Sequence, residues 1–411
     1  MTEPDSNSSS CKVDILIFGG GIAGLWLLNR LHDKGFNVIL LEAKAMGSGQ
    51  SVASQGIIHG GLKYALSGSV STASNAIASM PAHWRACLDG KGDIDLSRCN
   101  LLSEQYFMWS DGSLRSRLKT FLGSKSLRGK IKLLAEDQYP PFFADCTVPG
   151  SLYQLPDFVI DTGSLIASLS APHKDRIFCV EPSDIEFLQD NGHGPDGVRI
   201  KKGGRIVDIK FQRSVFAAGE GNLGLMQKAG LDSPAMQVRP LNMVMLRKKH
   251  LPLLYLHCIG DSFSLSPVLT LTSHVCKNGD VVWYLGGEIA ESGVARNRDQ
   301  QIRAASELLN KLFPWLNLTD ARWECLPINR AEGKAAGQHR PDAAFLQTES
   351  RIMVAWPTKF TLSPALAEEV LSALEIQAIV PKFCQPPELL YDMLPTPSLA
   401  LSPWETLFDH A

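Results

Sequence analysis

Two apolar runs that flank a glycine-rich turn stand near the start of the chain. Residues 13–18 are mostly apolar and lead into Gly-Gly-Gly-Ile-Ala-Gly at positions 19–24. Apolar residues then recur at helical spacing over 25–31, and a second apolar run, 38–41, ends at Glu42. Strand-length apolar runs on both sides of a helical period predict a strand–turn–helix–strand unit.

The alternation of apolar strands and amphipathic helices continues to about residue 377. The pattern predicts helices over 69–88, 164–169, 299–313 and 363–376. The predicted strands are 101–102, 106–109, 176–180, 184–188, 197–200, 204–211, 214–219, 236–246, 253–258, 281–287 and 352–356. Glycine turns separate several of these strands, which indicates short antiparallel pairs in the middle of the chain.

The composition is that of a globular protein. Its 411 residues are 45% hydrophobic and 20% charged, which suits two or more structural domains. The net charge of −2 gives the molecule no general attraction to nucleic acid or to an anionic membrane, so no nucleic-acid partner is expected. The basic residues between 115 and 132 form either a solvated face or a site for an anionic substrate or a nucleic acid.

The cysteine pattern predicts reduced thiols in a cytoplasmic protein. The nine cysteines are odd in number and never spaced as Cys-x-x-Cys, so neither a zinc site nor a disulfide framework is expected. Residues 1–12 are polar and serine-rich, as in a frayed tail, and do not resemble a signal peptide. No run approaches the ~20 apolar residues of a membrane helix, although a peripheral membrane contact stays open. Residues 386–411 are expected to pack on the body or on a partner.

The first glycine turn carries the clearest chemistry. Gly19 permits a tight turn, Gly21 lets the backbone approach a pyrophosphate, and Gly24 lets the helix pack closely on the strand. The helix N-terminus that follows presents free N–H groups to phosphates, and Glu42 can accept hydrogen bonds from a ribose diol. The alternative is a glycine-rich turn in another kind of α/β protein.

Three later segments are candidates to line the same ligand. Residues 43–64 are small, polar and glycine-rich around Ile57-Ile58-His59, so they either cross close to a flat ligand or form a flexible loop. Residues 214–219 end in Ala-Gly, and residues 357–361 precede a helix that has Pro364 in its first turn. Each of these turns could bring the backbone back to the ligand that the first glycine turn is expected to hold.

Taken together, these segments resemble the FAD-dependent oxidoreductases of the D-amino acid oxidase superfamily over roughly residues 12–377. The residues that carry the resemblance are the first turn with Glu42 and the segments 56–61, 215–219 and 358–361. Within the superfamily, Ile58 to Tyr64 is most similar to FAD-linked glycerol-3-phosphate dehydrogenases and also similar to L-2-hydroxyglutarate dehydrogenases. Lys359-Phe360-Thr361 again resembles the glycerol-3-phosphate group.

The resemblance implies an α/β fold with an α+β substrate part, in which a Rossmann-like FAD-binding domain is interleaved with an antiparallel-sheet substrate domain. The FAD-binding domain is expected in residues 12–65, 150–230 and 326–377, and the substrate domain in 66–149 and 231–325. Residues 1–11 are then a disordered tail and 378–411 a C-terminal extension. The FAD-binding residues that it implies are Gly19, Gly21, Ile22, Ala23, Gly24, Glu42, Ala43, Ser51, Ser54, Gln55, Gly56, Val180, Ala218, Gly219, Thr358, Phe360, Thr361 and Leu362.

The implied reaction moves hydride from a carbon bearing OH or NH2 to flavin N5, and the expected substrate is a small anionic hydroxy acid or polyol phosphate. His59 is the candidate base, since imidazoles exchange protons near neutral pH, or else it braces the loop. Arg330, Lys63 and Lys359 either hold a carboxylate or phosphate or are structural charges.

Two other functions stay open. One is amine oxidation like that of glycine or sarcosine oxidases, including an aminomethyl group on a larger molecule. The other is FAD binding without turnover. The electron acceptor is oxygen, a quinone or a protein.

Overall fold

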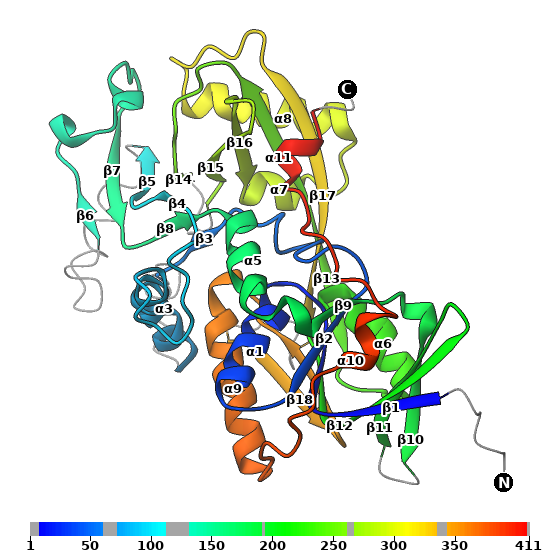
Figure 1. Cartoon of the computed structure of the whole chain (residues 1–411). Helices are drawn as coiled ribbons and strands as arrows, with labels where there is room; N and C mark the ends of the chain where they lie inside the picture. Colours follow the sequence, from blue (N-terminus) through cyan, green and yellow to red (C-terminus); the bar gives the residue numbers. More distant parts are fainter. Residues whose placement is uncertain are drawn as a thin grey trace.

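The strands of the chain form two large sheets and one small sheet (Figure 1). The computed structural model describes residues 8–60, 72–111, 131–190, 194–260, 267–334 and 343–408. Within these residues there are two eight-stranded sheets and one three-stranded sheet. Figure 1 shows the second large sheet in the upper part of the molecule and the first, with helices α1 and α9, in the lower part.

The first large sheet is mixed. Its strands are β1 (Ser8–Phe18), β2 (Val38–Glu42), β9 (Ile177–Cys179), β10 (Ile185–Asp190), β11 (Gly194–Lys202), β12 (Arg205–Phe216), β18 (Phe345–Glu349) and β19 (Ile352–Trp356). The order is β10-β11-β12-β1-β2-β9, with β19 also paired to β12 and β18 to β19. The pairs β1–β12, β1–β2, β2–β9 and β12–β19 are parallel.

Both faces of this sheet are covered, as is usual for parallel strands. Ile15 and Ile17 point into a core shared with α1 (Ile22–Asp33), α5 (Thr162–Ser170) and α9 (Ser363–Ile376). Leu16 and Phe18 point the other way, into a core that includes α6 (Asn222–Ala229) and α10 (Glu388–Tyr391). Successive side chains of a strand alternate between faces, so the continuous apolar run 15–18 supplies both cores.

The second large sheet is mainly antiparallel. Its strands are β5 (Tyr106–Asp111), β6 (Lys132–Leu133), β7 (Gly150–Leu155), β13 (Met236–Lys248), β14 (Leu256–Ile259), β15 (Leu269–Val275), β16 (Val281–Gly286) and β17 (Arg322–Gly333). The order is β17-β13-β16-β15-β14-β5-β7-β6, and only β14–β5 among its described pairs is parallel. Helix α8 (Arg298–Leu312) packs Ala305 and Leu309 onto the core of this sheet. Asn297 starts α8 with a capping box.

Shorter elements connect the two layers. The small sheet is β3 (Ile57–Ile58), β8 (Phe158–Ile160) and β4 (Leu101–Ser103), in that order. The remaining helices are α3 (Thr72–Leu88), α7 (Glu288–Ser292) and α11 (Pro403–Thr406). The 3-10 turns are η2 (Glu136–Gln138), η3 (Pro141–Phe143), η4 (Ala171–Arg176), η5 (Pro182–Asp184), η6 (Gly219–Gly221) and η7 (Phe360–Leu362). None of the helices in the described part of the chain is long and apolar enough to cross a membrane.

The predicted fold class is confirmed, and the four predicted helices appear as α3, α5, α8 and α9. The predicted tail is wrong at 8–11, because β1 begins at Ser8 and pairs with β12 from there. The separate strands predicted over 204–211 and 214–219 are largely one strand, β12, because no turn residue interrupts the run. The basic run between 115 and 130 and Lys63 lie outside the described residues.

Two predicted domain limits do not match the sheets to which the strands at those limits belong. The FAD-binding segment predicted to begin at 150 begins with β7, which pairs with β5 in the second sheet. The segment predicted to begin at 326 falls inside β17, which pairs with β13 along its length. Helix α3, predicted in the substrate domain, packs Ile77 and Trp84 into the core around α1. An apolar run does not specify its pairing partner, so these assignments depended on long-range contacts.

The C-terminal segment packs on the body of the protein, which is one of the two expected arrangements. Its backbone pairs with the first layer where the Met46 N–H donates to the Ser398 carbonyl (2.7 Å) and the Ala400 N–H donates to the Met46 carbonyl (3.0 Å). Trp404 then stacks on His274 of the second sheet, with ring centroids 3.6 Å apart. In Figure 1 this segment, in red, runs from α10 up to α11 beside β17.

Candidate active site

A cavity of about 1560 Å³ is lined by residues from both large sheets. It exceeds the roughly 300–1,000 Å³ of an ordinary small-molecule pocket, and so has room for an extended ligand together with a second molecule. It is lined by every predicted FAD-binding residue except Gly24 and Leu362, and by His59, Arg330 and Lys359. Leu362 is instead buried in the core next to α1.

The first turn has no space for side chains. Gly19 has φ +107°, and a Cβ there would lie 2.6 Å from Ala218 Cα. A Cβ on Gly24 would lie 1.9 Å from the Gly19 carbonyl oxygen. The α1 N-terminus opens on the cavity at Gly21, Ile22 and Ala23, where no side chain of the N-cap residue covers it. This end of the helix fits a diphosphate, because a helix N-terminus favours negative charge.

Glu42 lies where an adenosine ribose would be held. Its carboxylate lines the cavity at the end of β2 and accepts hydrogen bonds from the Gly20 N–H (2.5 Å) and the Lys44 N–H (2.8 Å). The neighbouring Val180 donates its N–H to the Glu42 carbonyl (2.9 Å), which places the Val180 backbone along the same wall. The residues present therefore fit the nucleoside part of a dinucleotide.

Asn222, which sequence reasoning did not select, bonds the second turn (residues 214–219) to the end of β19, directly before the third turn (residues 357–361). The Ala218 N–H donates to Asn222 Oδ1 (2.8 Å), and Asn222 Nδ2 donates to the Ala355 carbonyl (3.2 Å). Trp356 Nε1 also donates to the Gly219 carbonyl (3.0 Å). An asparagine directly after the Ala-Gly turn was the available signal, since such a side chain bonds to nearby backbone.

The segment that carries Ser51 to Gly56 is fixed on both sides. Ser51 Oγ accepts from the Ile22 N–H (3.0 Å), which ties it to α1. Gln55 Nε2 donates to the Tyr284 carbonyl (2.8 Å), and the Tyr284 hydroxyl donates to the Ala53 carbonyl (2.8 Å). These bonds hold the segment against β16, so it forms a wall of the cavity rather than a free loop.

The third turn contacts the His59 segment directly. The His59 N–H donates to Thr361 Oγ1 (3.2 Å), and that hydroxyl donates to the Ile57 carbonyl (3.3 Å). Trp84 of α3 fixes the turn through two contacts. Its Nε1 donates to the Thr361 carbonyl (3.0 Å), and its ring stacks with Phe360. Lys359 lies in the same turn, and Thr358 adopts φ +57° there.

A buried carboxylate that sequence reasoning missed orients His59. Asp157 Oδ2 lies 3.0 Å from His59 Nδ1, and Asp157 Oδ1 accepts from the Gly60 N–H (2.9 Å). The Asp157 side chain is 2% exposed, whereas the His59 side chain is 39% exposed and faces the cavity. A carboxylate can only accept, so Nδ1 carries the proton and Nε2 of the neutral ring is left with a lone pair.

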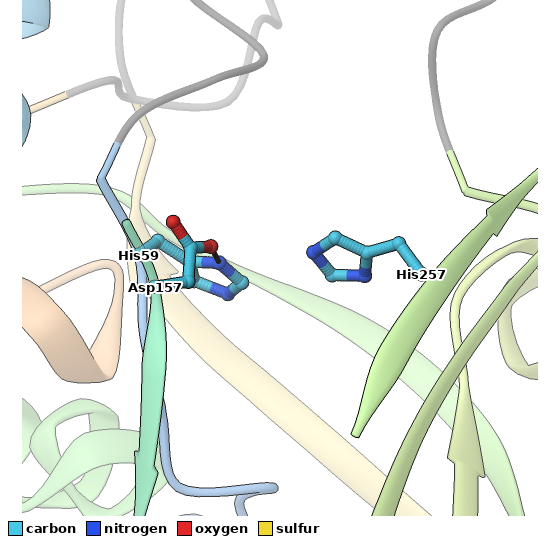
Figure 2. Close-up of side chains that lie close together, drawn as sticks. All are labelled: His59, Asp157 and His257. Atoms are coloured by element: carbon cyan, nitrogen blue, oxygen red, sulfur yellow. Dashed lines mark hydrogen bonds and ion pairs between the residues drawn. The ribbon is translucent and has the colours of Figure 1, made fainter. Parts of the chain in front are cut away.

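His257, also missed from the sequence, faces this pair. Figure 2 shows the two imidazoles pointing toward one another, with Asp157 beside His59. The ring centroids are 5.7 Å apart and the planes differ by 12°. Burial, together with the charge of protonated His59, lowers the pKa of His257 to about 3, although Asp157 opposes this shift.

Among the residues that the structure describes, two groups of side chains have metal-ligand composition. One oxygen of Asp157 and one nitrogen each of His59 and His257 lie within 4.8 Å of one another. The second group is His83, Cys87 and Asp93. There Arg30 Nε lies 2.9 Å from Asp93 Oδ2, so a guanidinium already supplies the positive charge.

The structure places Arg330 away from His59. Arg330 Nη2 donates to Glu291 (3.2 Å) on a part of the cavity wall formed by β17. His257 is on β14, four strands away in the same sheet. At roughly 4.8 Å per strand, that separates their backbones by ~19 Å along the sheet. Lys359, in contrast, shares the third turn with Thr361.

The chain is similar to known proteins over nearly its whole length. The sequence model of the family described as FAD dependent oxidoreductase (DAO) matches residues 14–372. The probable FAD-dependent oxidoreductase PA4991 of Pseudomonas aeruginosa is 43% identical over 398 residues, which cover 97% of this chain and 98% of that protein. Its crystal structure matches with a TM-score of 0.82 at 40% identity, over 97% of this chain and 99% of that one.

More distant structures share the fold. Glycine oxidase of Geobacillus kaustophilus has a TM-score of 0.63 at 16% identity, over 95% of this chain and 98% of that one. The L-α-glycerophosphate oxidase of Mycoplasma pneumoniae, determined with FAD bound, has a TM-score of 0.63 at 14% identity, over 89% of this chain and 95% of that one. At these identities the likeness concerns the fold alone.

Proposed function

This chain belongs to the DAO family of FAD-dependent oxidoreductases, and from that premise we propose that it oxidises a hydroxyl-bearing carbon of a small anionic substrate, a hydroxy acid or a polyol phosphate. The observation that carries the proposal is the His59–Asp157 pair at the cavity wall. Bound FAD supplies the acceptor for the hydride that leaves the carbon. The three turns around Gly19, Gly219 and Thr358 would hold it.

His59 takes the hydroxyl proton in this proposal. Oxidation of an alcohol to a carbonyl removes a hydride from carbon and a proton from oxygen, so a base beside the oxygen lowers the barrier. His59 Nε2 would accept that proton, and Asp157 would stabilise the imidazolium that forms. An amine loses its extra proton to solvent before oxidation, so a carboxylate–imidazole pair at the cavity wall favours the hydroxyl substrate.

The anionic part of the substrate would be held by basic groups of the cavity. Lys359 is the nearer candidate, because its turn bonds to the His59 backbone through Thr361. Arg330, which is paired with Glu291, would serve only a substrate that extends along the sheet toward β17. The similarity of the segments around His59 and Lys359 to glycerol-3-phosphate dehydrogenases supports a phosphate as the anion.

Anaerobic loss of flavin absorbance against a panel of metabolites tests the proposal. The panel contains 2-hydroxy acids, polyol phosphates, and glycine-like amines, and it reports the substrate class whether the natural acceptor is oxygen, a quinone or a protein. Loss of absorbance with hydroxy compounds is expected. Loss with amines alone would replace the proposal by amine oxidation, and loss with no compound would contradict it.

Replacing His59 tests the proton transfer. His59→Gln should slow flavin reduction by about 10²- to 10⁴-fold, the usual contribution of a general base, with a smaller effect on substrate Kd. Rapid-mixing absorbance at several substrate concentrations separates the two effects. His32→Gln is the matched control, because His32 is exposed on α1. A reduction rate that His59→Gln leaves unchanged would remove His59 from the mechanism.

A further inference from the structure

His257 is a polar side chain of the cavity that the proposed proton transfer does not use. It lies on β14, is 8% exposed and lines the cavity opposite His59. Figure 2 shows its ring directed toward the His59–Asp157 pair. A buried imidazole that faces a substrate cavity needs a partner for its inner nitrogen and one for its outer nitrogen.

The inner nitrogen has its partner in the protein. His257 Nδ1 lies 3.2 Å from the Tyr106 hydroxyl, and that hydroxyl lies 3.0 Å from the Leu256 carbonyl. The hydroxyl has one proton, and a carbonyl can only accept, so the Tyr106 O–H donates to Leu256. His257 Nδ1–H then donates to the Tyr106 oxygen, and Nε2 is left as an acceptor toward the cavity.

The charge state of the ring supports the same assignment. Burial and the neighbouring His59 lower the pKa of His257 to about 3. The ring therefore stays neutral at physiological pH and carries one proton, which the bond to Tyr106 places on Nδ1. Tyr106 is itself fully buried in the core beside β3, so the hydrogen-bond chain that sets the tautomer is shielded from water.

We propose that His257 selects the substrate, by accepting a hydrogen bond from a hydroxyl on the carbon next to the one that is oxidised. The reacting substrate is then a vicinal diol carrying an anionic group, rather than a simple 2-hydroxy acid. The inference rests on the proposed function, because it takes the reacting hydroxyl to lie at His59, whose ring centroid is 5.7 Å from that of His257.

A 2-hydroxy acid is disfavoured at this position by its own chemistry. One neighbour of its reacting carbon is a carboxylate, whose oxygens only accept hydrogen bonds, and the other, C3, bears no hydroxyl in a simple 2-hydroxy acid. Placed against the acceptor nitrogen of His257, a carboxylate oxygen would face a lone pair with neither group satisfied. A hydroxyl at the same place donates to His257, so a buried site discriminates strongly between the two.

A pair of substrates that differ in one hydroxyl tests the inference. Glycerol 3-phosphate has a hydroxyl beside its central carbinol, and propane-1,2-diol 1-phosphate has a methyl group there. In anaerobic rapid mixing with the holoenzyme, the diol should give a ratio of reduction rate to Kd at least about tenfold higher than the deoxy compound. Lactate, as the 2-hydroxy acid, should be slower than the diol.

Variants then assign the preference to His257. In His257→Leu the diol-to-deoxy ratio should fall to about one, because the acceptor is gone. In His257→Gln part of the ratio should return, since an amide oxygen also accepts. Tyr106→Phe should lower the ratio as well. It removes the hydroxyl that fixes the His257 proton on Nδ1, and it does not change the cavity wall. Flavin content and thermal midpoint of each variant show whether it is folded.

Each outcome separates the two proposals. Two results would overturn the role of His257 and leave the proposed function standing. One is an equal ratio of reduction rate to Kd for the diol and the deoxy compound in the wild-type protein. The other is a diol-to-deoxy ratio that His257→Leu leaves unchanged. Faster reduction by lactate than by the diol would do the same. Reduction by amines only, or by no compound, would overturn the proposed function and this inference together.

Discussion

Asp157 decides which nitrogen of His59 is available to a substrate. Its two oxygens are used on His59 Nδ1 and on the Gly60 N–H, so the carboxylate and the ring are held in one orientation. The Asp157 carboxylate is 2% exposed and therefore shielded from water. Its charge acts mainly on the imidazole. Reactivity at this wall thus depends on a residue 98 positions away in the sequence.

Asp157→Asn should slow flavin reduction by about 10²- to 10⁴-fold while FAD stays bound. The amide oxygen can still accept from the Gly60 N–H, which turns the NH2 group toward His59 Nδ1. Nδ1 must then accept, and the proton moves to Nε2, where a base is needed. Rapid-mixing absorbance measures the rate, and Asp137→Asn, at an exposed position, is the control. A wild-type rate in Asp157→Asn would contradict the assigned tautomer.

The β1–α1 turn combines packing and ligand binding in one element. Gly24 lies in the first turn of α1, against the Gly19 carbonyl, and Gly19 in turn lies against Ala218 of the second turn. The backbones of two turns that are 200 residues apart therefore touch without intervening side chains. Any atom added at this contact moves the N–H groups that are expected to hold the diphosphate.

Gly24→Ala should destabilise the protein by about 1–3 kcal/mol, the usual range for overpacking, and lower its FAD content. The added Cβ would lie 1.9 Å from a backbone oxygen, so the turn must shift. Gly163→Ala in α5 is the matched control, because a Cβ there meets nothing closer than 3.4 Å and Gly163 is not among the residues that line the cavity. Denaturant midpoints and the flavin-to-protein absorbance ratio measure both effects. If Gly24→Ala matched the control, the proposed packing role would be excluded.

The C-terminal segment joins the two layers of the molecule. It pairs with Met46 in the first layer and inserts Trp404, 3% exposed, against His274 of β15 in the second. Cys276 Sγ also donates to the Trp404 carbonyl (3.4 Å). Ala400 and Leu401 line the cavity between these two attachments. The segment therefore couples the stability of the fold to the region around the cavity.

Burial of His274 predicts that stability falls in acid. Desolvation lowers its pKa to about 3, against about 6.5 in an unfolded chain. Between these values the unfolded state binds more protons, so the free energy of unfolding rises with pH and is lost as pH falls. The loss is at most about 1.4 kcal/mol per pH unit, or about 2 kcal/mol from pH 6.5 to about pH 5.

Between about pH 7.5 and about pH 5 the wild-type protein loses free energy of unfolding. His274→Gln should make this loss smaller by about 2 kcal/mol. Urea unfolding at both pH values measures it, and the difference between them cancels any pH-independent cost of the substitution. His250→Gln, at an exposed position, should leave the wild-type loss in place. An equal loss in His274→Gln and in the wild-type protein would show that His274 is not the titrating group.

The sequence by itself determined the local parts of this protein. The β1–α1–β2 unit, the helix α8 with its cap and the third turn before α9 follow from periodicity and from glycine and proline sterics, which act over a few residues. The same local logic pointed to a dinucleotide, and the resemblance to the D-amino acid oxidase superfamily implied FAD and the role of His59. Membership of the DAO family shows that the cofactor was correctly inferred.

Only the tertiary structure decided which distant residues meet. His59 joins Asp157 because β3 pairs with β8, and His257 faces them because β14 pairs with β5. The placement of β7 and β17 in the second sheet, against the predicted limits, has the same origin. Pairing partners and register depend on packing across the whole core, which no short window of apolar and polar positions encodes.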